Sequence, residues 1–200
     1  MDPRRSVASA LALALCVIGV ASAQEKRGIE ELPKFSQVNP NLFRGAQPKE
    51  GGIDRLKNMG IKTIINLRDS NDQTKNEEDQ ATTRGLHYFN IPLPNFDRPS
   101  DETVSQILLL ITSAENQPVF VHCKRGSDRT GTIIALYRIE FDGWTGDRAK
   151  SEAKQHGMGF WQYKMKDYIE DYYTRRSRQR PTDQMKSSKP PIASHPLFEY

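Results

Sequence analysis

Residues 118–141 constrain the fold of this chain more than any other segment. Pro118-Val119-Phe120-Val121 is a short, wholly apolar run of the kind that forms a strand buried on both faces of a sheet. The loop at 122–131, which contains two glycines, comes next, and apolar residues then recur at helical spacing through 130–141. A buried strand, a tight loop and a helix in this order predict one unit of an α/β domain.

Residues 24–173 continue this alternation of strands and helices and contain no internal repeat. Runs rich in β-branched and aromatic residues predict strands, and apolar residues recurring at i, i+3, i+4 and i+7 predict helices. We expect strands at 61–67, 86–93 and 118–121, and helices at 53–59, within 70–85, from Ser100 or Asp101 to 111, and at 130–141, 145–156 and 160–173. The predicted fold is α/β, a single domain with a mostly parallel central sheet flanked by helices.

The first 23 residues do not read as part of this domain. Two arginines precede an apolar run from Ala8 to Val20, and Ala21-Ser22-Ala23 has the small-x-small form of a cleavage site. This is the layout of a secretory signal peptide, with Gln24 as the mature N-terminus. The apolar run is shorter than the ~20 residues of a spanning helix, which favours cleavage over the alternative of an N-terminal membrane anchor. We expect an exported protein, periplasmic or secreted, with no stable membrane insertion after cleavage.

Residues 174–200 are basic, contain four prolines and show no apolar periodicity, which predicts a disordered tail. The net positive charge of the chain lies in this tail and in the predicted signal peptide, since the whole chain carries +4 while residues 24–173 carry about −1. No basic stripe with interleaved aromatic residues runs through the domain. Nucleic acid is therefore not an expected partner.

Cleavage of the leader would remove Cys16 and leave Cys123 as the only thiol. A lone cysteine in an exported protein has no internal disulfide partner, so it is either a sheltered free thiol or a functional group. The helix dipole and the positive groups around Cys123 favour its thiolate form. His122 could orient the loop through its ring N–H, and the Thr130 hydroxyl could hydrogen-bond the sulfur as it leaves.

The loop at 122–131 suits the binding of a tetrahedral dianion. Successive backbone N–H groups that enter a helix N-terminus can point inward and form a nest for such an anion. Gly126 and Gly131 supply the backbone freedom and the close approach that the loop requires. Arg129 can fold back to hold two phosphate oxygens at once. Together these features indicate a phosphate-binding loop with a nucleophile at its base.

This loop, HCKRGSDRTG, resembles the HCxxGxxR(S/T)G signature of the cysteine-based protein tyrosine and dual-specificity phosphatases. Flanking segments agree with the small atypical dual-specificity group: NLFRGAQP at 41–48, GIKTIINLR at 60–68, YFNIPL at 88–93 and DGW at 142–144. The resemblance covers about residues 35–173 and implies the dual-specificity-phosphatase-like fold. It also implies a two-step mechanism without metal, in which Cys123 attacks phosphorus, Arg129 and the loop amides hold the oxygens, and water hydrolyses the phosphocysteine.

The resemblance further implies an aspartate, upstream of the cysteine, that protonates the leaving oxygen. The family position, counted from the IPL segment, falls near Asn95, so this sequence departs from the usual spacing. We choose Asp97, in the irregular Pro-flanked stretch after Leu93, as the general acid. Asp101 and Asp128 are the alternatives, although Asp101 also suits the first turn of a helix, where the dipole favours a carboxylate.

The expected site residues follow from these assignments. The catalytic set is Cys123, Arg129, Asp97 and Thr130, and the phosphate-binding set is His122, Lys124, Arg125, Gly126, Ser127, Asp128 and Arg129. The histidines His87, His156 and His195 lack ligand spacing, so neither a metal nor another cofactor is expected. The aromatic residues Trp144, Phe160, Trp161 and Tyr163 are interpreted as core and helix-face residues rather than as a substrate clamp.

The substrate class has two readings. Phosphorylated protein, through phosphotyrosine or with dual specificity, comes first, and the positive charges of Lys124 and Arg125 keep an inositol polyphosphate or phosphoinositide as the alternative. A module that binds phosphate without turnover is a further alternative. The unassigned general acid supports it, because a site without such an acid would bind the anion well and hydrolyse the ester slowly. Sulfur transfer and arsenate reduction fit less well, because arsenate reduction usually needs resolving cysteines. We expect a monomer.

Overall fold

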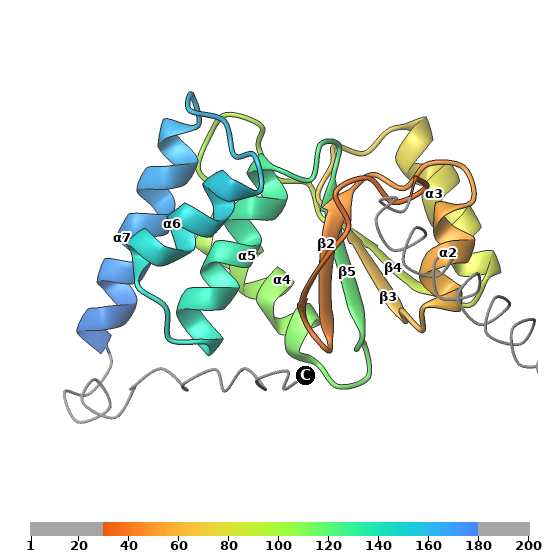
Figure 1. Ribbon diagram of the computed structural model, residues 1–200, viewed down its shortest axis with the longest axis horizontal. Helices are drawn as coiled ribbons and strands as arrows, with labels where there is room; N and C mark the ends of the chain where they lie inside the picture. The colour runs from red at the N-terminus through yellow and green to blue at the C-terminus, as the bar shows by residue number, and fades with distance from the viewer. Residues whose placement is uncertain (1–29, 180–200) are drawn as a thin grey trace, which may run out of the picture.

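The computed structural model describes residues 30–179 and contains one five-stranded sheet with helices on both faces (Figure 1). The strands are β1 (Ser36–Asn39), β2 (Leu42–Ala46), β3 (Thr63–Asn66), β4 (His87–Asn90) and β5 (Val119–Cys123). Their order across the sheet is β1-β2-β5-β3-β4. Only β1 pairs antiparallel, so the prediction of a mostly parallel sheet is confirmed.

Strand β5 occupies the centre of this sheet. It pairs in parallel with β2 on one side and with β3 on the other, and all five of its residues are buried. This position explains the wholly apolar run at 118–121, because a central strand is covered on both faces. The two N-terminal strands were not predicted, since β1 and β2 are short and mix polar with apolar residues.

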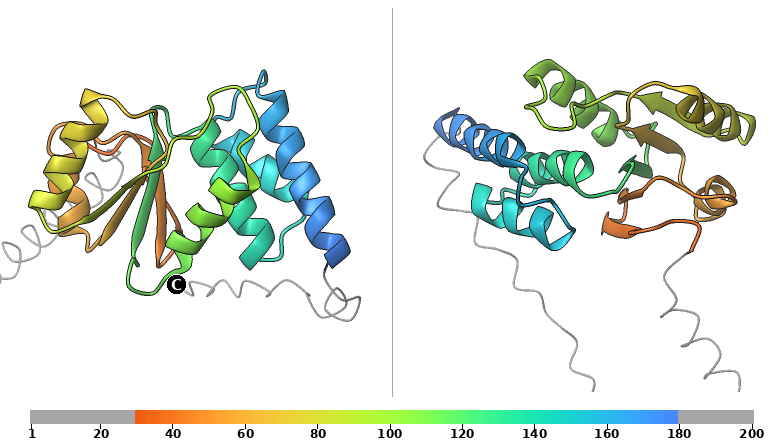
Figure 2. Two further views of the ribbon diagram at one scale, coloured as in Figure 1. Left: turned by 180° about the vertical axis from the view of Figure 1, so that it is seen from behind. Right: turned by 90° about the horizontal axis from the view of Figure 1, so that it is seen from above.

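The helices form two layers, one on each face of the sheet (Figure 2). On one face lie α2 (Gly52–Asn58) and α3 (Asp72–Thr83), over a core that includes Leu56, Ile64 and Phe120. On the other face lie α4 (Asp101–Thr112), α5 (Asp128–Phe141), α6 (Gly146–Gln155) and α7 (Tyr163–Gln179), over a larger core. All six predicted helices are therefore present.

Some predicted boundaries need correction. Helix α5 begins at Asp128 rather than at Thr130, and the N-cap of α4 is Ser100, whose hydroxyl accepts from the Thr103 amide at 3.1 Å. The expected tail starts too early, because α7 continues to Gln179. Ion pairs from Arg175 to Asp101 and from Arg176 to Glu140 hold this last part of the helix against its neighbours. The predicted signal peptide at 1–23 and the rest of the predicted tail, 180–200, lie outside the described residues.

The carboxyl ends of the four parallel strands meet at one edge of the sheet. The loops that leave β3, β4 and β5 gather there, next to the loop between α6 and α7 (Figures 1 and 2). Ligands bind at this edge in α/β folds, because loops of different strands converge there. Within residues 30–179, no helix is long and apolar enough to cross a membrane.

Candidate active site

The loop between β5 and α5 turns sharply over the end of β2. Gly126 has a φ of +67°, which favours glycine, and a Cβ atom there would come within 2.5 Å of the backbone of Gly45. The carbonyl of Gly126 accepts a hydrogen bond from Arg44 Nη2 at 3.3 Å. The tight turn therefore depends on a glycine and on a buried arginine beneath it.

Arg44 is a part of the site that was not singled out from the sequence. Its side chain is buried on β2, and burial lowers its pKa to about 10, while the nearby Glu152 and Cys123 act in the opposite direction. A cation behind the loop supports an anionic sulfur electrostatically. The segment NLFRGAQP contained this residue, but nothing in it indicated that the guanidinium would be buried.

Cys123 is the last residue of β5 and is buried at the base of the loop. Burial raises the pKa of its thiol, but the nearby hydroxyl and amide of Thr130, the charge of Arg129 and the Gly126 amide lower it by more. The pKa of Cys123 consequently lies below its ordinary value. These are the surroundings in which a cysteine acts as a nucleophile at neutral pH.

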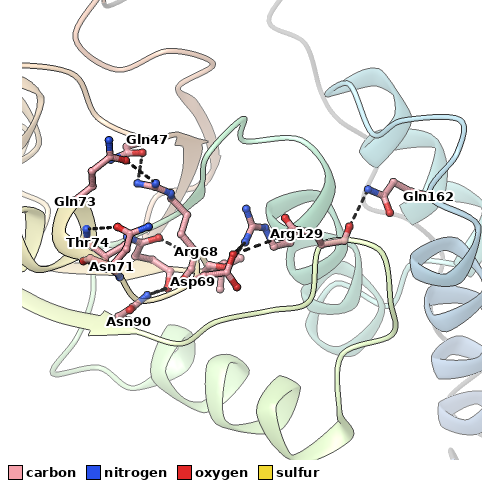
Figure 3. A network of polar contacts seen from close by, with 12 residues as sticks. Gln47, Arg68, Asp69, Asn71, Gln73, Thr74, Asn90, Arg129 and Gln162 are labelled. Atoms are coloured by element: carbon pink, nitrogen blue, oxygen red, sulfur yellow. Dashed lines mark hydrogen bonds and ion pairs between the residues drawn. The ribbon is translucent and has the colours of Figure 1, made fainter.

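Arg129 is the second group at the base of the site. Its Nη1 donates to the carbonyl oxygen of Leu67 at 3.1 Å and lies 3.7 Å from Asp69 Oδ2 (Figure 3). Asp69 was missed in the sequence, although it follows the predicted strand at 61–67. The carboxyl end of a strand that neighbours β5 was the signal that could have pointed to it.

A cavity of about 390 Å³ opens above the cysteine. It is lined by Asn95, Phe96, Cys123, Lys124, Arg125, Asp128, Arg129 and Gln162. The structure thus brings five predicted site residues to one cavity: Cys123, Lys124, Arg125, Asp128 and Arg129. Cavities of this size accommodate small organic ligands, so a phosphate ester and part of its leaving group fit.

His122 and Ser127 lie behind the cavity rather than on its surface. His122 is fully buried, stacks on Phe120 and has its Nε2 2.7 Å from Glu77 Oε1 of helix α3. The hydroxyl of Ser127 accepts from Lys34 Nζ at 2.6 Å. These two side chains therefore hold the loop in place, and neither touches the space for the substrate.

Asp128 is bound on both carboxylate oxygens. Oδ1 accepts from the amide of Gly159 at 2.8 Å, and Oδ2 accepts from Arg125 Nη2 at 2.6 Å. Asp128 is also buried. A general acid needs an oxygen free to carry a proton to the leaving group, so this arrangement favours a structural role for Asp128.

The other two candidate acids lie outside the cavity lining. Asp97 is next to Phe96, has a side chain that is 62% exposed, and pairs with Lys164 at 3.1 Å. The Arg98 amide and Lys164 lower its pKa. Asp101 accepts from Tyr168 and from Arg175 at the start of α4, away from Cys123. Of the two, Asp97 is the one whose loop borders the cavity.

No cluster of three or more His, Cys, Asp or Glu side chains with metal-binding geometry occurs among residues 30–179. The groups that meet at the base of the cavity are the thiol of Cys123, the guanidinium of Arg129 and the amides of the loop. Residues 22–171 match the family model described as a DSP-PTPase phosphatase fused to NAD+ kinase. The chain belongs to this phosphatase family. The assignment to the protein tyrosine and dual-specificity phosphatases is confirmed.

Relatives that are named for two different substrate classes, protein and inositol phosphate, are similar to this chain. Dual specificity protein phosphatase TpbA of Pseudomonas aeruginosa (strain UCBPP-PA14) is 32% identical over 125 residues, which are 62% of this chain and 54% of that protein. Inositol diphosphatase DSP4 of Arabidopsis thaliana is 29% identical over 125 residues, which are 58% of this chain and 63% of that protein. The chain spans little more than half the length of the first of these relatives.

Solved structures share the fold. The crystal structure of P. aeruginosa TpbA has a TM-score of 0.59 at 24% identity and covers 77% of this chain and 89% of that chain. The core catalytic domain of PP-IP phosphatase SIW14 from S. cerevisiae, in complex with citrate, has a TM-score of 0.65 at 18% identity and covers 76% and 93%. The expected dual-specificity-phosphatase-like fold is confirmed.

Proposed function

We propose that this chain is a cysteine-dependent phosphatase that hydrolyses phosphate monoesters through a phosphocysteine intermediate. The observation that carries the proposal is the position of Cys123. Its thiol has a lowered pKa and lies at the base of a cavity beside the guanidinium of Arg129. A thiolate under an anion-binding loop can attack phosphorus without help from a metal.

The reaction has two steps. In the first, the Cys123 thiolate attacks phosphorus, an S–P bond forms, and the ester P–O bond breaks as the leaving oxygen takes a proton. In the second, water attacks phosphorus, the S–P bond breaks, and inorganic phosphate and the thiolate are released. Arg129 and the loop amides stabilise the oxygens in both transition states, and Thr130 stabilises the departing sulfur.

Asp97 is the proposed donor of the first proton. It lies on the loop that carries Phe96 into the cavity lining, and Asp128 has both oxygens engaged. The present ion pair with Lys164 must break before Asp97 can turn inward. Asp69, which lies 3.7 Å from Arg129, is the second candidate because it is the carboxylate beside the catalytic guanidinium.

The substrate proposal gives phosphorylated protein first place, as phosphotyrosine or with dual specificity. The relative TpbA is named a dual specificity protein phosphatase, and one solved TpbA structure is described as a complex with pTyr. The alternative substrates are inositol phosphates, because other relatives are named inositol diphosphatases and because Lys124 and Arg125 line the cavity.

We also propose export, on the basis of the signal-like segment at 1–23.

The test is phosphate release from four substrates: p-nitrophenyl phosphate, a phosphotyrosine peptide, a phosphoinositide and an inositol polyphosphate. Turnover that is lost in Cys123→Ser would establish the cysteine phosphatase, and the relative kcat/KM values would assign the substrate class. Tight binding of these anions with no release from any of them would instead establish a phosphate-binding module. Export is tested separately, by mass spectrometry of the N-terminus of the secreted or periplasmic protein, which should begin at Gln24.

A further inference from the structure

Exposed aromatic side chains lie on or beside the two segments that contribute Phe96 and Gln162 to the cavity lining. Phe96, which is 69% exposed, belongs to the loop between β4 and α4, Phe160 (74%) and Trp161 (44%) belong to the segment between α6 and α7, and Tyr163 (64%) is the first residue of α7. We call these four residues the aromatic rim. The sequence interpretation as core or helix-face residues is therefore wrong for Phe160 and Trp161, whereas Tyr163 does lie on the exposed face of a helix and Trp144 packs against the core.

Hydrogen bonds connect the two segments of the aromatic rim to each other and to the catalytic loop. Gln162 Nε2 donates to the carbonyl oxygen of Asn95 at 3.0 Å (Figure 3), and the amide of Gly159 donates to Asp128. The indole of Trp161 lies so close to Gly159 that a Cβ atom there would be 2.5 Å from the ring. The rim is thus a preformed surface, and ordering it on binding costs little entropy.

Three cations beside the rim are already bound to protein oxygens. Lys164 pairs with Asp97, Arg125 pairs with Asp128, and Lys166 Nζ donates to the carbonyl oxygen of Phe160 at 2.9 Å. Arg125 also lies 5.9 Å from the ring centre of Trp161. Anionic lipid surfaces and polyphosphates are attracted by cations without such partners. Lys124 is exposed and has no such partner among the described residues, but it lines the cavity, where the phosphate of the substrate would sit, so the charge of the rim itself favours an uncharged, apolar group.

We infer that the aromatic rim binds an apolar side chain close to the phosphorylated residue of a protein substrate. This inference rests on the proposed phosphatase function and selects protein over inositol phosphates. Rigid aromatic side chains dominate the energy of many protein interfaces, because they bury large areas and lose few rotamers. Once the phosphate is seated above Cys123, neighbouring residues of the peptide would lie against Phe96, Phe160 and Trp161.

The experiment compares two phosphotyrosine peptides that differ only in their flanking residues, leucine in one and serine in the other. For the parent chain, kcat/KM should be about tenfold higher on the leucine peptide. Trp161→Ala and, separately, Phe160→Ala should remove most of this preference. Neither variant should change kcat/KM on p-nitrophenyl phosphate by more than about twofold, because Phe160 and Trp161 do not line the cavity that holds the phosphate.

Phe141→Ala is the matched control. Phe141 is an aromatic side chain, 49% exposed, at the far end of α5, and its removal should leave the peptide preference unchanged. Equal rates on both peptides, or a preference that persists in Trp161→Ala and Phe160→Ala, would overturn the inference. Failure to hydrolyse p-nitrophenyl phosphate would instead overturn the proposed function, so the two failures are distinguishable.

A vesicle experiment addresses the competing ligand. Vesicles of phosphatidylcholine with and without phosphatidylserine are sedimented with the parent chain and with Trp161→Ala. We expect no binding that depends on Trp161. Binding of the parent to either vesicle that disappears in the variant would show that the aromatic rim is a membrane-contact surface, and the inference of a peptide site would be wrong.

Discussion

His122 Nε2 lies 2.7 Å from Glu77 Oε1, and both side chains are buried between β5 and α3. Glu77 is thus a carboxylate turned inward on a helix whose other faces are mostly polar and exposed. His122, the residue before Cys123, is thus contacted by a side chain far away in the sequence. A buried polar group with a single charged partner is costly to separate from that partner.

Glu77→Ala should lower the free energy of unfolding by about 3 kcal/mol, because it leaves the imidazole of His122 buried without its partner. Glu78→Ala, on the exposed side of the same helix, should cost less than about 0.5 kcal/mol. Urea unfolding of the two variants measures the difference. Equal losses would show that the contact between Glu77 and His122 contributes nothing to stability.

Thr130→Ala should raise the pKa of Cys123, because the Thr130 hydroxyl is the largest of the effects that lower it. Activity depends on the thiolate, so the acidic limb of the kcat/KM profile should move to higher pH. The rate of alkylation of Cys123 by iodoacetamide across pH, followed by mass spectrometry, measures the pKa directly. Turnover at neutral pH should fall roughly tenfold or more, and Thr130→Ser should restore both properties.

Lys164→Met should raise the pKa of Asp97. The Arg98 amide lowers that pKa most and Lys164 lowers it next, and the substitution removes the contribution of Lys164. A general acid must be protonated, so activity is lost as the pH rises through its pKa, and the alkaline limb of kcat/KM should move to higher pH in Lys164→Met. In Asp97→Asn that limb should disappear, with a loss of about 10²-fold on alkyl phosphates. An unchanged profile in Asp97→Asn would transfer the role to Asp69.

Gly126→Ala should destabilise the chain by more than about 2 kcal/mol, because it combines a positive φ with an overlap between Cβ and the backbone of Gly45. Gly60→Ala is the control. Gly60 also has a positive φ, +82°, but no atom lies within 4 Å of its Cβ position, so the cost should be about 1 kcal/mol. Thermal unfolding of both variants separates the steric overlap from the backbone strain.

The elements with a strong local pattern could be predicted from the sequence. The apolar strand at 118–121 and the periodic helix after it define the position of the catalytic loop, and Cys123 and Arg129 lie there as expected. Contacts between distant segments could not be predicted. The burial of Arg44 and Glu77 depends on which strand lies beside β5 and on which helix covers it, and no local pattern contains that information.

The solvent exposure of the aromatic side chains was the second property that could not be predicted from the sequence. An aromatic pair such as Phe160-Trp161 has the same hydrophobicity in a core as on a surface, so its composition favours the core. The structure shows that no helix of the described residues covers these two rings, which remain 74% and 44% exposed. The general acid was uncertain for a related reason, because Asp97 pairs with Lys164 of α7 and Asp128 accepts from the Gly159 amide in the loop after α6.

The carboxylate of Asp128 accepts from Arg125 within the loop that follows Cys123 and from the Gly159 amide in the segment that contains Trp161. One side chain therefore helps to hold both the loop of the proposed reaction and the segment of the aromatic rim. A substitution at this position is expected to change both the rate of the proposed phosphatase reaction and the peptide preference inferred for the aromatic rim. Related chains that differ at this position are where a change of preferred target should be sought first.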